Sequence, residues 1–209
     1  EADLDDVNTL VEMIAQSEKP MLICGGGVVR SRAHEEFRAF ARRIDSPCAI
    51  TVMGGGIHAG NATRYAEFNI VADPEAASVV FSSGVKTVMI GLDATNLCYQ
   101  PRSDIELLRA PTELGRIVPA MLSSYADVYK QVHNIDGMMI HDAICAVYLW
   151  KPALFTCISC RMTVCLEEGE HLGQTIPEAG DTCLAATSCD AQVIREEILS
   201  VMRQVVAAH

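Results

Sequence analysis

Two short apolar runs in this chain each end in three consecutive glycines. The first is Met21–Cys24, followed by Gly25–Gly27, and the second is Cys48–Met53, followed by Gly54–Gly56. Between them, residues 33–44 carry apolar side chains at helical spacing, with charged residues on the opposite face. A strand, a helix and a second strand in this order predict a β-α-β unit with a parallel crossover. The sequence therefore predicts an α/β fold, with a mainly parallel sheet flanked by helices on both faces.

Local signals predict the elements that follow. Asp73 and Pro74 suit the start of a helix that runs to about Ser82, and the apolar run 85–92 suits a buried strand. Residues 162–167 are expected to form a further strand, and residues 190–206 an amphipathic terminal helix.

A long helix is predicted over residues 113–132, where apolar side chains recur at helical spacing. The side chains expected to face inward are Leu114, Ile117, Val118, Met121, Leu122, Tyr125 and Tyr129.

Composition excludes several classes of partner. The 209 residues suit one domain or two small ones, and half of them are hydrophobic, enough for a sizeable core. A net charge of -11 disfavours binding to nucleic acids or anionic membranes. The chain has neither a long apolar run that could span a bilayer nor a basic, then apolar, N-terminus. We expect a soluble, cytoplasmic protein whose nine cysteines are reduced and mostly buried.

The stretch after the second glycine triplet carries three short polar side chains. They are Asn61, Glu67 and Asn69, and they lie within nine positions of one another. Two amides and one carboxylate could bind several hydroxyls of a small polyhydroxylated ligand at the edge of the sheet. The alternative interpretation is a loop with solvated Asn and Glu side chains.

A second polar pair, His141 and Asp142, begins the apolar helix that continues to Leu149. Asp142 could be an N-cap with His141 as its neighbour, or the pair could belong to a functional site. Asp93, after the strand at 85–92, is interpreted as a cap or turn former. The pair Cys157 and Cys160 lacks the further ligands that a zinc site requires.

The run GN-x5-EFN at residues 60–69, with MGGG before it and DPEAA behind it, resembles the nucleoside hydrolases. The pair HD at 141–142, followed by P-x-L-F at 152–155, resembles the same family, and the resemblance covers about residues 48–206. It implies hydrolysis of the N-glycosidic bond of ribonucleosides. It also implies a Rossmann-like fold in which Asn61, Glu67 and Asn69 hold the ribose hydroxyls and Met53 lies at the sugar.

The resemblance further implies that His141 lies near the leaving base, as a candidate catalytic and substrate-binding residue, and that Asp142 ligates Ca²⁺. One carboxylate cannot hold calcium, which takes about six to eight oxygens. The family's N-terminal motif, of the type D-x-D-x-G-x-D-D, would supply the remaining carboxylates and the general base. Asp3, Asp5 and Asp6 are only superficially similar to it. We therefore expect weak or absent catalysis.

Residues 5–56 resemble the central domain of thiamine-diphosphate enzymes of the acetolactate synthase type, which serves structure and sometimes binds FAD. The predicted division is 1–52 and 53–209, within one continuous α/β domain. The two resemblances together suggest a join between two family fragments near residues 50–56. This join could be a natural fusion, an engineered chimera or a designed sequence. The alternatives to a hydrolase are a non-catalytic ribose- or nucleotide-binding domain and a structural fragment of a thiamine-diphosphate enzyme. Whether the chain forms a homo-oligomer is left open.

Overall fold

A computed structural model of the chain describes residues 50–208 and, ahead of them, residues 12, 16, 39, 40 and 43. The chain divides into two units, Glu1–Ala49 and Ile50–His209, and the strands and helices named below belong to the second. The predicted strand at 21–24 and most of the predicted helix at 33–44 lie outside the described residues. The domain boundary between residues 52 and 53 stays a prediction.

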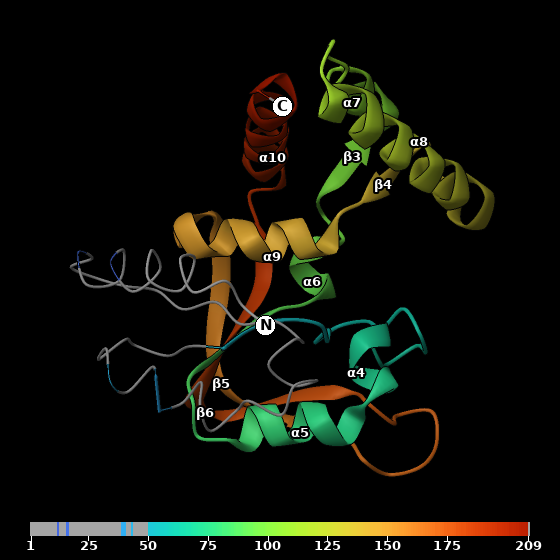
Figure 1. Cartoon of the computed structure of the whole chain (residues 1–209). Coiled ribbons are helices and arrows are strands. Elements are labelled where there is room, and N and C mark those ends of the chain that lie inside the picture. Colours follow the sequence, from blue (N-terminus) through green and yellow to red (C-terminus); the bar gives the residue numbers. More distant parts are fainter. Residues whose placement is uncertain (1–11, 13–15, 17–38, 41–42, 44–49, 209) are drawn as a thin grey trace. The chain divides into compact units, whose positions relative to one another are not determined.

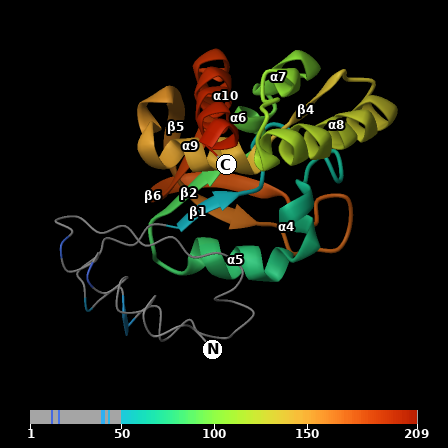
Figure 2. The same cartoon turned by 45° about the horizontal axis from the view of Figure 1, so that its top comes forward.

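The main sheet has four strands in the order β1-β2-β6-β5 (Figures 1 and 2). Strand β1 (Ile50–Met53) pairs in parallel with β2 (Thr87–Ile90), and β2 pairs in parallel with β6 (Thr175–Cys189). Strand β5 (Phe155–Val164) pairs with β6 in the antiparallel sense. The prediction of an α/β fold with a mainly parallel sheet is therefore confirmed.

Helices cover both faces of this sheet because side chains alternate along its strands. Val88 and Ile90 of β2 pack in one core cluster, which includes side chains of α9 (His141–Trp150) and α10 (Ala191–Ala208). Met89 packs in a cluster on the other face, with side chains of α4 (Phe68–Ala72) and α5 (Pro74–Ser82). The start of α5 is as predicted, since the Asp73 carboxylate accepts the Ala76 N–H at 2.9 Å.

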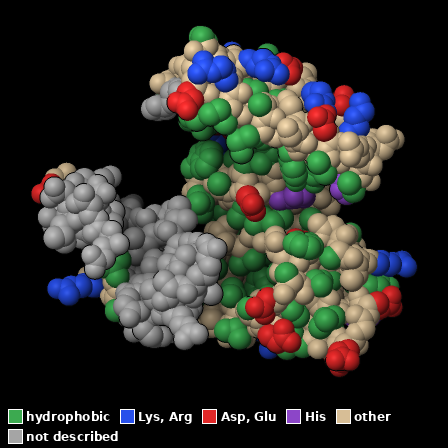
Figure 3. All heavy atoms as spheres, turned by 45° about the vertical axis from the view of Figure 1, so that its right-hand side comes forward, with side chains coloured by type: hydrophobic (Ala, Val, Ile, Leu, Met, Phe, Trp, Pro, Cys, Tyr) green, Lys and Arg blue, Asp and Glu red, His purple; other side chains and the backbone are tan. Residues whose placement is uncertain are grey.

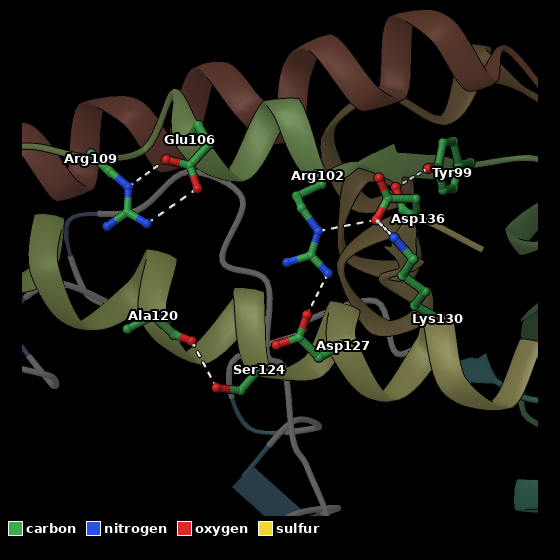
Figure 4. A network of polar contacts seen from close by, with 9 residues as sticks. All are labelled: Tyr99, Arg102, Glu106, Arg109, Ala120, Ser124, Asp127, Lys130 and Asp136. Carbon is green, nitrogen blue, oxygen red and sulfur yellow. Dashed lines mark hydrogen bonds and ion pairs between the residues drawn. The ribbon is translucent and has the colours of Figure 1, made fainter. Parts of the chain in front are cut away.

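Smaller elements complete the unit. They are α6 (Leu92–Thr95), β3 (Tyr99–Pro101), α7 (Arg102–Glu106), α8 (Glu113–His133), β4 (Gly137–Met139) and the short 3-10 helix η1 (Pro152–Leu154). Strands β3 and β4 form a separate antiparallel pair. Next to it, the Arg102 guanidinium bonds Asp127 at 2.7 Å and Asp136 at 3.2 Å (Figure 4). These exposed ion pairs orient α7 against α8 and contribute little to stability.

Helix α8 buries only part of the predicted face, since Leu114, Val118, Leu122 and Tyr129 are half-buried. Leu122 and Tyr129 do pack against a core cluster, but Ile117, Met121 and Tyr125 are 44%, 66% and 44% exposed. The fully buried positions are instead the small or compact residues Gly115, Pro119 and Ala126. The apolar residues of α8 lie on more than one face, so periodicity alone could not choose between them.

The hairpin of β5 and β6 was largely missed. Strand β5 begins at Phe155 rather than at Met162, and β6 was not predicted. Pro177 and Gly180 lie inside β6, and both residues usually signal a turn. They are tolerated because this part of β6 pairs only with β5, where the register also shifts between Cys160 and Arg161. Among the described helices, none combines the length and apolar character needed to cross a bilayer.

Candidate functional site

The end of β1 is a glycine turn that closely approaches the end of β2. Gly54 and Gly55 have φ angles of 154° and 76°, which favour glycine. The Gly55 carbonyl accepts the Leu92 N–H at 2.8 Å. A Cβ atom on Gly91 would lie 2.5 Å from that carbonyl oxygen, so the space admits only backbone. The two strand ends thus form a compact floor at the C-terminal edge of the sheet, where α/β folds bind ligands.

Glu67 lies beneath this turn and is 2% exposed. Its Oε2 atom accepts the Gly55 N–H at 3.0 Å and the Ile70 N–H at 3.2 Å. The carboxylate therefore caps α4 and fixes the glycine turn at the same time. Its other oxygen, Oε1, takes part in neither bond. A solvated loop side chain, the alternative interpretation, does not describe Glu67.

The two asparagines lie at the ends of this short segment and are exposed. The Asn61 Oδ1 atom accepts the Phe68 N–H at 2.8 Å. The Asn69 amide donates towards Met53, at 3.2 Å from Sδ and 3.5 Å from the carbonyl oxygen. Asn69, Met53 and Glu67 therefore gather around the end of β1. Their role as ribose ligands stays a prediction.

His141 begins α9 and contacts the end of α6. Its Nδ1 atom lies 2.8 Å from Oγ1 of Thr95, a side chain with 0% exposure. Burial lowers the pKa of His141, while the negative charges of Glu67 and Asp142 oppose this change. Figure 3 shows histidine and carboxylate side chains in a recess of the surface.

Asp93 holds the loop that follows the glycine turn. Its Oδ2 atom accepts the Ile57 N–H at 2.6 Å, and Oδ1 accepts the His58 N–H at 3.2 Å. The same Oδ1 lies 2.5 Å from Nδ1 of the His58 ring. These contacts agree with the interpretation of Asp93 as a turn former.

The model of the inosine-uridine preferring nucleoside hydrolase family matches residues 6–200 of this chain. The chain belongs to this family.

Individual nucleoside hydrolases give the same result. The pyrimidine-specific ribonucleoside hydrolase RihA of Salmonella newport (strain SL254) is 33% identical over 166 residues, which are 75% of this chain and 50% of that protein. RihA of Shewanella sp. (strain MR-4) is 33% identical over 177 residues. The solved purine-preferring ribonucleoside hydrolase from Gardnerella vaginalis superposes with a TM-score of 0.74 at 26% identity, over 82% of this chain and 57% of that one. The chain spans about half the length of the curated relatives it matches.

The nucleoside hydrolase match begins far ahead of the predicted start at about residue 48. It includes nearly all of residues 5–56, the segment similar to the central domain of thiamine-diphosphate enzymes. That second similarity finds no support in these comparisons, and a join between two families is not needed to account for the sequence. Asp3, Asp5 and Asp6 lie outside the described residues.

Asp142 is exposed in the first turn of α9. The family resemblance predicted this residue to ligate calcium. It is not an N-cap, because Ile140 occupies that position without a side-chain bond. Within residues 50–208, no three His, Cys, Asp or Glu side chains come together as a metal site would require. The described residues therefore do not fit a complete calcium site, which takes about six to eight oxygens. Cys157 and Cys160 likewise belong to no such group.

Sequence reasoning missed two buried threonines of this chain. Thr95 contacts His141, as described above. The Thr175 hydroxyl donates to the Gly56 carbonyl at 3.0 Å, and the Gly56 N–H lies 3.0 Å from the same Oγ1 atom. Thr175 opens β6, a strand that was itself not predicted, so no local signal pointed to it. Thr95 follows the GLD segment at the end of β2, and its position after a buried strand could have indicated it.

The half-buried His141 should make folding stability depend on pH. Its pKa in the folded chain lies below the usual 6.5, so the unfolded chain binds the proton more readily. The stabilising contribution of His141 is present above pH 6.5 and is lost as the pH falls through the folded-state pKa. We expect the melting temperature of the native chain to fall towards that of His141→Gln between about pH 8 and pH 5. Calorimetry at each pH measures the difference.

His133→Gln is the matched control, because His133 is exposed at the end of α8. The expectation fails if the difference from the native chain has the same pH profile for both variants.

Proposed function

We propose that this chain binds a ribonucleoside at the end of β1 and takes part in hydrolysis of its N-glycosidic bond. The observation that carries the proposal is the gathering of Met53, Glu67 and Asn69 around the end of β1, with α9, which begins at His141, lying against that strand. Family membership supports the reaction class. A homo-oligomer and a cytoplasmic location stay predictions from the sequence.

The polar side chains are suited to a sugar. Cleavage of an N-glycosidic bond passes through an oxocarbenium-like ribose, which must be held while the base departs. Glu67 Oε1 and the side-chain oxygen Oδ1 of Asn69 are acceptors for ribose hydroxyls. The side-chain NH₂ group of Asn61 is a donor. Because Glu67 is already fixed by two backbone N–H groups, little side-chain freedom is lost when the sugar binds.

His141 is placed to act on the leaving base. With its Nδ1 atom engaged by Thr95, the Nε2 atom is the one left for a ligand. If the Thr95 hydroxyl donates to Nδ1, the neutral ring carries its proton on Nε2 and can donate it to a base nitrogen.

Family resemblance also implies Ca²⁺, which would bind ribose hydroxyls and lower the pKa of a bound water. Among residues 50–208, Asp142 is the candidate ligand, and no further carboxylate joins it to complete a site. We therefore derive no step of the reaction through the metal, and treat calcium dependence as a property to be measured.

The test is release of reducing sugar from inosine and from uridine, with added calcium and with a chelator. If calcium takes part, the chelator abolishes the release and Asp142→Asn lowers it by roughly 10-fold or more, as loss of a charged ligand would. Asp181→Asn removes another exposed carboxylate, on β6, and should leave the rate unchanged. Equal rates for Asp142→Asn and Asp181→Asn would contradict the role of Asp142.

A second candidate function is ribose binding without turnover. It is favoured by the incomplete metal site within the described residues. Saturable binding of ribose or inosine to a folded chain that releases no sugar would support it. Calcium-dependent release would exclude it.

A further inference from the structure

Two thiols from distant parts of the chain are in contact next to α6. Cys98 follows α6, and Cys189 is the last residue of β6. Their Sγ atoms are 3.5 Å apart, and the Cys189 Sγ also lies 3.3 Å from the Ala94 carbonyl oxygen. Helix α6 lies against this end of β6 (Figure 1). Neither thiol has a place in the proposed hydrolysis, so their pairing calls for a separate explanation.

The two thiols differ in access to solvent. Cys98 is 2% exposed, whereas Cys189 is partly exposed. Cys160 and Cys183 also face each other across β5 and β6, but both are buried, at 3% and 1% exposure. A soluble oxidant can therefore reach the first pair through Cys189, while the second pair offers no such entry.

The contact between the two sulfurs also gives the two thiols different reactivity. The contact between the two sulfurs lowers the pKa of Cys189, while the same contact, together with burial, raises the pKa of Cys98. The thiolate is the nucleophile in cysteine oxidation, and its partner then resolves the oxidised sulfur. Cys189 is thus suited to react first, and Cys98 to react second.

We propose that Cys98 and Cys189 form a reversible dithiol that hydroperoxides oxidise to an intramolecular disulfide. The Cys189 thiolate attacks one peroxide oxygen, the O–O bond breaks, and a sulfenic acid and hydroxide form. The Cys98 sulfur then attacks the sulfenic sulfur, and the hydroxyl leaves with the Cys98 proton as water. The proton that Cys189 gave up neutralises the hydroxide. Two thiols and one hydrogen peroxide thus give one disulfide and two waters.

The geometry requires only local motion. A disulfide places its sulfurs about 2.0 Å apart, so the two Sγ atoms must approach by roughly 1.5 Å through side-chain rotation. The bond would tie the turn after α6 to the end of β6 and close a loop from residue 98 to residue 189. A long closed loop restricts the unfolded chain, so oxidation should raise the melting temperature by roughly 5–10 °C.

The test treats the full chain with hydrogen peroxide, blocks free thiols under denaturing conditions and maps tryptic peptides without reduction. We expect peptide 87–102, which contains Cys98, to be joined to peptide 162–195, with a mass two hydrogens below the sum. Dithiothreitol should release both. Peptide 162–195 also contains Cys165 and Cys183, so the variants decide which thiol is joined.

Cys189→Ser should abolish the joined peptide, whereas Cys183→Ser and Cys165→Ser should leave it unchanged. Persistence of the joined peptide in Cys189→Ser would overturn the proposal. So would conversion of Cys189 in the native chain to its sulfinic acid without any cross-link. The mapping of the native chain does not depend on how well any variant folds.

Discussion

Glu67→Ala should strongly reduce sugar release and destabilise the chain. The substitution leaves two buried backbone N–H groups, of Gly55 and Ile70, without an acceptor. Unsatisfied buried donors cost about 1–3 kcal/mol, which would lower the melting temperature by roughly 3–10 °C. Loss of charged hydrogen bonds to the sugar should reduce kcat/KM by roughly 100-fold or more. Calorimetry and the sugar-release assay measure the two effects separately.

Two further variants separate the causes. Glu67→Gln keeps one amide oxygen as an acceptor and should recover much of the stability while remaining impaired in hydrolysis. Glu75→Ala removes an exposed carboxylate from the first turn of α5 and should be close to native in both measurements. A Glu67→Ala chain with native stability would show that the carboxylate does not hold the glycine turn.

Gly91→Ala should be among the most destabilising substitutions in the sheet. The added Cβ would lie 2.5 Å from the Gly55 carbonyl oxygen and 3.2 Å from that of Gly54, and neither is a side chain that could rotate away. The strand ends must separate, which weakens the bond between the Leu92 N–H and the Gly55 carbonyl. We expect a loss of about 2–4 kcal/mol in the free energy of unfolding, measured by urea denaturation.

Gly84→Ala is the matched control for this substitution. Gly84 has a φ angle of 75°, but a Cβ there would meet nothing within 4 Å. Its cost is therefore backbone strain alone, about 1 kcal/mol. If Gly91→Ala costs no more than Gly84→Ala, then close contact between the two strand ends does not constrain residue 91.

Elements with strong local signals were predicted well. The Asp73-Pro74 helix start, the apolar β2 and the start of α9 at His141 each rest on residues within one element. The exposed face of α8 and the hairpin of β5 and β6 were not predicted. In both cases contacts between distant elements decided the outcome, and periodicity carries no information about them.

The candidate site divides in the same way. Met53, Asn61, Glu67 and Asn69 lie in one short segment, so their proximity could be predicted from the chain. That Glu67 bonds backbone N–H groups could not, because the geometry of the glycine turn decides it. Thr95 reaches His141 across 46 residues, and Thr175 reaches Gly56 across 119. The position of Thr95 after a buried strand could have indicated it, whereas no local signal pointed to Thr175.

The contact between Gly56 and Thr175 also bears on how the site comes into existence. Closing a loop of 119 residues costs conformational entropy. Contacts offset this cost only once the strands that flank the two residues are already paired. The glycine turn should therefore reach its final shape late in folding, after β2 and β6 have joined. Until then the candidate site is not preorganised, and the chain completes it nearly at the same moment as it completes the sheet.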